Sequence, residues 1–169
     1  MAQNQESKIR DRALFDRLYV AQEDLRQAMS FASMILKKGW HFQPWEKRQT
    51  IYIQQSAYTT ALVVAYSRPF TESRGWPKLP MRLMKYNEEQ KQLHKRVLSL
   101  RNEVYAHTDV AKRNLRTFEI DGTPSAIEAL PAMRFTREET EMIIAMMHMA
   151  YESIGKRLVE LMKSVVEET

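Results

Sequence analysis

Residues 14–39 read LFDRLYVAQEDLRQAMSFASMILKKG, and this stretch decides the fold class. Its apolar residues recur in steps of four and three, at Leu14, Leu18, Ala21, Leu25, Ala28, Ala32 and Ile35. That spacing places them on one stripe of an α-helix. Two lysines followed by Gly39 are typical of a helix C-terminus. The pattern predicts a first helix from Ser7 to Lys38, roughly 45 Å long.

Three further helices follow from the same kind of pattern. The second is expected to begin at Pro44, which suits a first helical position, and to end at Arg68 because a proline comes next. The third carries apolar residues in four–three steps up to residue 104, and it begins after a cap at Asn87 or earlier, near Pro80. Residues 136–139, TREE, form a capping box that opens the last helix.

The tract from residue 110 to residue 135 is the least helical. Thr117–Ile120, the turn signal Asp121-Gly122 and Met133–Phe135 predict a short hairpin or an irregular flap. The fold class is therefore predicted as all-α: an antiparallel bundle of four, or four to five, helices. A short β-hairpin or irregular insert precedes the last helix, and residues 1–169 form a single domain.

Composition excludes several classes of protein. The 4 glycines and 6 prolines among 169 residues are too few for sheet-rich folds, and the absence of cysteine removes thiolate chemistry. The four histidines show neither the HExxH spacing nor the Glu-x-x-His pattern of metal sites, so we expect neither a metal nor another cofactor. No apolar run reaches membrane-spanning length, and a cytoplasmic protein is predicted.

The net charge of +5 is unevenly distributed along the chain. Residues 1–68 carry a net charge of +4 and residues 69–116 one of +6, whereas residues 117–169 carry −5. A basic front half favours a partner that bears phosphate, such as RNA. The alternative is that these charges only solvate helix faces.

One stretch near the end of the third helix carries the residues for chemistry: residues 100–109, LRNEVYAHTD. Arg101 is followed by Asn102, and five residues separate Arg101 from His107. This arrangement resembles the R-x(4–6)-H signature of the HEPN family, in which Asn, Asp or His often follows the arginine. HEPN domains are helical bundles of four or five helices with the motif on a late helix, which agrees with the predicted architecture.

The three motif residues suit metal-independent RNA cleavage. His107 can act as base or acid because its ordinary pKa of about 6.5 allows both forms at neutral pH. Arg101 offers a permanently charged fork to phosphate oxygens, and Asn102 can orient either partner. Six helical residues leave Arg101 and His107 roughly 120° apart, so they converge if the helix loosens or if two protomers pair their motifs. The resemblance implies the second route, a homodimer with one cleft.

Further RNA contacts are expected around the motif. Tyr105 and Asp109 resemble residues often found beside it, and His94 lies seven residues before Arg101, on nearly the same helical face. Arg68 is expected to face a cleft at the end of the second helix. Each has a structural alternative: a buried hydrogen-bonded role for His107, a solvated surface for His94, a helix cap for Asp109, and a salt bridge or carbonyl cap for Arg68.

The resemblance implies an endoribonuclease of toxin or phage-defence type that acts as a homodimer and is inhibited by an antitoxin protein. The alternative is a non-catalytic HEPN-like module that binds nucleotides or a partner, for example a nucleotidyltransferase antitoxin. A purely structural helical dimer is a third reading.

Overall fold

The computed structural model of the protein describes residues 2–43, 46–47, 49–72, 79–102, 114–129 and 134–166. Most of them are helical. Helix α1 spans Ala2–Lys38, so it begins before the predicted start and ends where expected. The apolar stripe is confirmed as core, because the small and branched residues from Leu18 to Ile35 that were assigned to it are almost fully buried.

Gly39 ends α1 in the predicted way. Its φ of +63° lies in the left-handed region, which glycine adopts without a Cβ penalty. The amide of Gly39 donates to the carbonyl of Leu36, and the amide of Trp40 donates to that of Ile35. These two bonds satisfy carbonyls that the end of a helix would leave unpaired.

Helix α2 spans Gln49–Ser67, so the prediction of a helix beginning at Pro44 is wrong, although Pro44 itself lies outside the described residues. Arg68 does not end α2 but opens a short 3₁₀ helix, η1, over Arg68–Phe70. Pro69 has no amide hydrogen to continue the α-helical bonding, which accounts for the tighter turn.

Helix α3 spans Glu88–Leu100 and follows a second 3₁₀ helix, η2, over Met81–Leu83. The predicted cap at Asn87 is confirmed: its side chain accepts a bond from the Gln90 amide, and the Gln90 side chain accepts one from the Asn87 amide. Of the two predicted starts, the later one is therefore correct. Two acidic residues in the first turn add a favourable interaction with the helix dipole.

Helix α4 spans Arg137–Val166, and its predicted capping box is confirmed. The Glu139 amide donates to Thr136 Oγ1 over 3.1 Å, and the Thr136 amide donates to Glu139 Oε2 over 2.9 Å. Glu139 also pairs with Arg96, whose guanidinium lies over the Phe135 ring, 5.4 Å from its centroid. The start of α4 is thus tied to α3.

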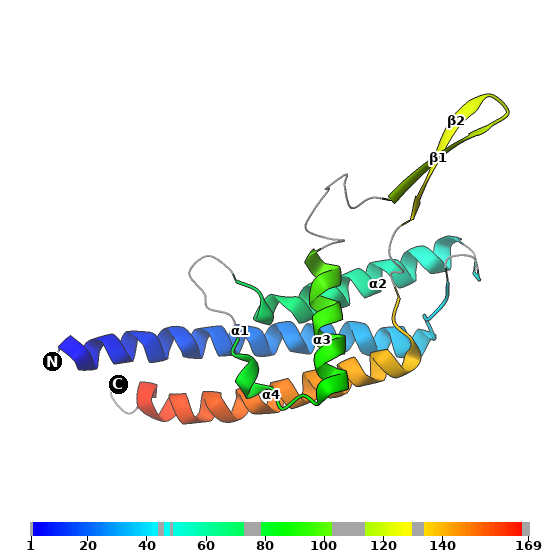
Figure 1. The fold of residues 1–169 in the computed structure, drawn as a ribbon. Helices are drawn as coiled ribbons and strands as arrows, with labels where there is room; N and C mark the ends of the chain where they lie inside the picture. Colours follow the sequence, from blue (N-terminus) through cyan, green and yellow to red (C-terminus); the bar gives the residue numbers. More distant parts are fainter. Residues whose placement is uncertain are drawn as a thin grey trace.

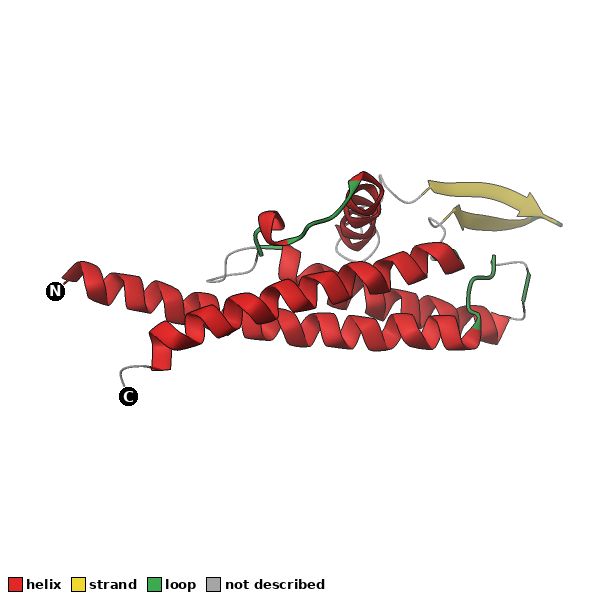
Figure 2. Cartoon of the chain, turned by 90° about the horizontal axis from the view of Figure 1, so that it is seen from below, coloured by secondary structure: helices red, strands yellow, loops and turns green. Residues whose placement is uncertain are grey.

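Helices α1, α2 and α4 lie side by side, with α2 and α4 running opposite to α1, and α3 crosses them steeply (Figure 1). Turned by 90°, the molecule presents α3 almost end-on while the other three helices still lie along its length (Figure 2). Helix α1 packs against both α2 and α4, so the core follows its buried stripe.

The predicted hairpin exists, but its second strand was placed wrongly. Strand β1 spans Asn114–Ile120 and strand β2 spans Thr123–Ala129, paired antiparallel with Ile120 opposite Thr123. Positive φ angles at Asp121 and Gly122 close a two-residue turn of the kind that favours hairpins, so the second strand begins at once. Phe135, expected in that strand, is instead a buried core residue, and the hairpin extends away from the helices (Figure 1).

Among the described residues, none of the helices is both long and apolar enough to cross a membrane.

The fully buried Gln55 generates a prediction for stability. Its side chain accepts from the Phe42 amide over 2.8 Å and donates to the Phe42 carbonyl over 2.9 Å, which fixes the segment after α1 on α2. Gln55→Leu leaves both backbone groups unpaired, so we expect the free energy of unfolding to fall by about 1–3 kcal/mol in urea titrations. The control is Gln54→Leu on the exposed side of α2, and equal losses in both variants would contradict this role.

Candidate nucleic-acid interface

The described part of the predicted motif lies at the end of α3. Arg101 directly follows the helix and is half-buried, whereas Asn102 is exposed, and the backbone of both is π-helical. Single π-helical turns inside helices are frequent at functional sites. A loosened helix was one of the two routes by which Arg101 and His107 could converge, and the π-helical backbone lies at the first residues of the motif.

Asn102 holds the guanidinium of Arg101. Arg101 Nη1 donates to Asn102 Oδ1 over 3.0 Å, which fixes one edge of the planar group. A guanidinium has five N–H donors, so several remain for the oxygens of a phosphate. The predicted orienting role of Asn102 toward its neighbour therefore has a geometric basis. His107, Tyr105 and Asp109 lie outside the described residues, and their predicted roles stay predictions.

Arg68 lies at a second position, where α2 gives way to η1. Its side chain is 56% exposed and pairs with Asp24 of α1, which is 10% exposed, with 3.3 Å between Nη1 and Oδ1. The salt bridge considered as the alternative to an RNA contact is thus present. A half-exposed guanidinium keeps donors for solvent or a ligand, so the RNA contact of Arg68 remains a prediction.

The buried side chain of Arg17 binds the backbone of η1 next to Arg68. Arg17 Nη2 donates to the carbonyls of Arg68 and Pro69, over 3.0 and 2.8 Å. Burial lowers the pKa of Arg17, and the nearby Asp24 carboxylate acts in the opposite direction. The sequence analysis did not identify Arg17 and Asp24. Each directly precedes a leucine of the apolar stripe of α1, and this position beside the stripe is the signal in the sequence that indicates them.

His94 does not belong to an accessible groove. Its side chain is only 5% exposed, so both the predicted RNA contact and the alternative of a solvated surface residue need correction. Its Nδ1 lies 2.8 Å from the Tyr66 hydroxyl, and its ring meets the edge of Phe70 with 4.7 Å between centroids. Burial lowers the pKa of His94 to about 4, so the ring is neutral at physiological pH.

Two tyrosines complete the cluster around His94. Burial raises the pKa of Tyr66 well above its ordinary value and that of Tyr86 to about 12. The Tyr86 hydroxyl donates to the carbonyl of Met146 in α4 over 3.2 Å. The cluster therefore joins α2, α3 and α4, and it determines where α3 presents Arg101.

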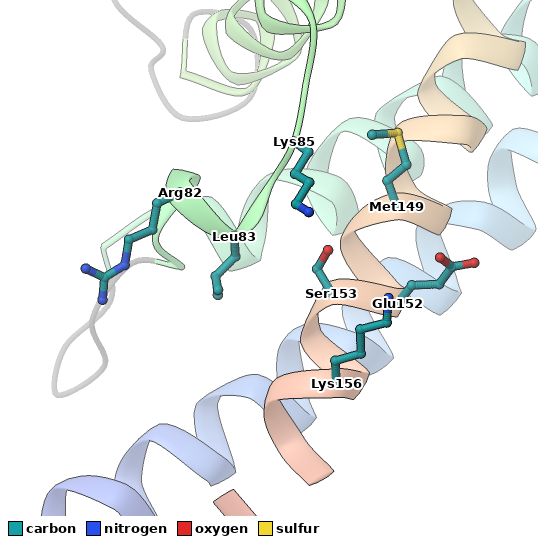
Figure 3. Close-up of a pocket in the computed structure, with 7 residues that line it drawn as sticks. All are labelled: Arg82, Leu83, Lys85, Met149, Glu152, Ser153 and Lys156. Carbon is teal, nitrogen blue, oxygen red and sulfur yellow. The ribbon is translucent and has the colours of Figure 1, made fainter. Parts of the chain in front are cut away.

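A pocket of about 340 Å³ is the main site that sequence reasoning missed (Figure 3). Its lining residues come from η2, the segment after it and α4: Arg82, Leu83, Lys85, Met149, Glu152, Ser153 and Lys156. Two groups more than sixty residues apart in the sequence meet here, so no local pattern reports it. Within the described ranges, no group of three or more His, Cys, Asp or Glu residues is placed to hold a metal ion.

No protein family, curated protein or solved structure matches the chain.

The depressed pKa of His94 predicts a dependence of stability on pH. The folded protein keeps the ring neutral down to about pH 4, whereas the unfolded chain binds the proton near pH 6.5. Unfolding takes up a proton between these values, so the free energy of unfolding falls as the pH drops from 6.5 to 4, by at most about 3 kcal/mol.

Urea denaturation at several pH values measures this slope. His94→Phe is expected to flatten the slope between pH 6.5 and 4, even if its stability is lower at every pH. His148→Phe changes an exposed histidine and is expected to keep the wild-type slope. A wild-type slope in His94→Phe would show that another group is responsible.

Proposed function

We propose that the chain is a HEPN-like endoribonuclease that cleaves RNA without a metal ion and acts as a homodimer. The observation that carries the proposal is the Arg101–Asn102 pair at the exposed end of α3, with the guanidinium fixed by its neighbour. A mainly helical scaffold supports the proposal, and Arg101 and Asn102, the described part of the motif, directly follow α3. The excess of positive charge over residues 69–116 favours an RNA substrate.

The proposed chemistry divides the reaction between two histidines. His107 takes the proton of the ribose 2′-OH, and the 2′-oxygen attacks the adjacent phosphorus. The bond from phosphorus to the 5′-oxygen breaks, and the partner subunit's His107 gives its proton to that oxygen. The products are a 2′,3′-cyclic phosphate and a free 5′-hydroxyl. Arg101 stabilises the negative charge that builds on the phosphate oxygens, where a preorganised cation contributes most.

Helix α2 supports the homodimer. Its nineteen residues include no charged side chain, which is unusual for a helix with a surface side. Ile53 and Ala57 are exposed, and Ala61 and Val64 are half-buried, so these four follow one outer face in steps of four and three. Helix α2 also packs against α3. A second copy seated on this face would lie beside the helix that carries Arg101.

The biological setting follows from the same resemblance. We place the protein in the cytoplasm, as a toxin or phage-defence nuclease whose activity an antitoxin protein restrains. Growth arrest on expression, relieved by His107→Ala, is the expected cellular signature.

Cleavage of RNA by the purified protein in EDTA tests the activity. Arg101→Ala and His107→Ala are each expected to lower the rate at least about 100-fold, because they remove charge stabilisation and proton transfer. Arg12→Ala, which removes an exposed arginine of α1, is expected to keep the wild-type rate. Equal cleavage by all four proteins would contradict the assignment, and intact RNA with every protein would favour the non-catalytic alternative.

The dimer is tested with two apolar residues of nearly equal exposure. Ile53 on α2 is 59% exposed and Val159 on α4 is 57% exposed. Ile53→Glu places a carboxylate in the proposed interface and is expected to give a monomer by light scattering, with loss of RNA cleavage. Val159→Glu is expected to remain a dimer. A monomeric wild type, or a dimeric Ile53→Glu, would contradict the interface on α2.

A further inference from the structure

The hairpin of β1 and β2 stands apart from the helices. Neither strand packs extensively against a described helix, and the hairpin projects away from them (Figure 1). Phe118 is 38% exposed and Ile120 is 55% exposed, and both lie on one face because they are two residues apart on a strand. Two strands alone are marginally stable in water, so a further strand beside the hairpin would supply contacts that it lacks.

The turn of the hairpin decides which backbone groups face outward. The two-residue turn at Asp121-Gly122 makes Ile120 and Thr123 a hydrogen-bonded pair. Hydrogen-bonded and non-hydrogen-bonded pairs alternate along an antiparallel ladder. The N–H and C=O groups therefore point to the outer edge at every second residue of β1: Leu115, Thr117 and Glu119. Among the described residues the sheet consists of these two strands, so none of them pairs with that edge.

The two outer edges of the hairpin differ because of one proline. Pro124 of β2 stands opposite Glu119, in a pair whose backbone groups face outward. A proline has no N–H, so the outer edge of β2 lacks a donor at that position. Prolines on edge strands hinder the addition of a further strand. Strand β1 contains no proline, and each of its outward residues keeps both N–H and C=O. The edge that is free for pairing is therefore that of β1.

A second copy of the chain fits this edge. Two β1 strands can run antiparallel about a twofold axis that passes between their Phe118 residues. Thr117 of each protomer then exchanges hydrogen bonds with Glu119 of the partner subunit. The two phenylalanines form a non-hydrogen-bonded pair, in which side chains lie closest and aromatic rings stabilise the sheet. Strand β1 carries one arginine and one glutamate, so two copies meet without net repulsion.

We propose that two copies of the chain join their hairpins through β1 into one four-stranded sheet, in the order β2–β1–β1–β2. The exposed face that carries Phe118 and Ile120 then continues across both copies, and the edges left outside are those with Pro124. A contact along one strand of seven residues is too small to hold two proteins together by itself. The inference therefore rests on the self-association in the proposed function, but it does not depend on RNA cleavage.

A disulfide between introduced cysteines tests the pairing, because the chain has no cysteine of its own. Phe118→Cys keeps the backbone bonds and places two thiols in an opposed pair, with about 4.5 Å between Cα atoms, which a disulfide can span. A covalent dimer is expected after mild oxidation. The control is Ser125→Cys, which lies opposite Phe118 on the same face of the hairpin. Two Ser125 positions would lie three strand spacings apart, roughly 14 Å, so no disulfide is expected.

A proline introduced into β1 tests the edge itself. Thr117 lies opposite Ala126, and the N–H groups of both face outward, so a proline at either position leaves the ladder of the hairpin complete. Thr117→Pro in the Phe118→Cys protein removes a donor from the pairing edge, and loss of the disulfide-linked dimer is expected. Ala126→Pro adds a second proline to the edge of β2 and is expected to leave the yield of the linked dimer unchanged.

Light scattering of the same proteins separates this inference from the proposed function. A dimeric Phe118→Cys protein that forms no disulfide, or equal linkage in Ser125→Cys, would overturn the hairpin contact and leave the homodimer intact. Linkage that survives Thr117→Pro would also overturn the contact. A monomeric wild type together with an unlinked Phe118→Cys protein would overturn both proposals. Linkage of Phe118→Cys in a protein that leaves RNA intact would support the contact and contradict the nuclease.

Discussion

The buried stripe along α1 is the constraint on which the remaining structure depends. Leu18, Leu25 and the alanines between Ala21 and Ala32 are fully buried, and both α2 and α4 pack against this one helix. Small residues let neighbouring helices approach closely, and the leucines fill the space between them. Since both sides of the stripe are occupied by α2 and α4, the shorter α3 is left to cross over the assembly rather than lie along it (Figure 2).

The crossing of α3 explains why two different surfaces exist. The cluster of His94 with Tyr66, Phe70 and Tyr86 holds the middle of α3, and Arg96 ties it to the start of α4. The middle of α3 is thus fixed. Before the start of α3, η2 and the segment after it lie against α4 and form the pocket with it. At the other end of α3, which packs against α2, lie Arg101 and Asn102.

Local signals predicted the local structure well. The stripe of α1, Gly39, the cap at Asn87 and the capping box at Thr136 each depend on residues a few positions apart, and all are confirmed. The turn at Asp121-Gly122 was predicted too, but the second strand was predicted at Met133–Phe135 and instead spans Thr123–Ala129, directly after the turn. That phenylalanine is needed in the core instead.

Features made by distant residues escaped prediction. The burial of His94 depends on rings from three separate segments, and nothing near position 94 indicates them. The pocket likewise joins residues 82–85 to residues 149–156, and its charges look like ordinary surface charges in the sequence. Of the candidate site, the sequence pattern identified Arg101 and Asn102, while the supporting pair of Arg17 and Asp24 required the structure.

In the proposed homodimer, the ends of α3 from two protomers meet. Because the chain has no cysteine, a single cysteine introduced by Asn102→Cys can be cross-linked selectively by a short bismaleimide. The account predicts a covalent dimer from Asn102→Cys at low protein concentration, and none from Lys37→Cys at the far end of α1. A dimeric protein in which Asn102→Cys fails to cross-link would contradict it.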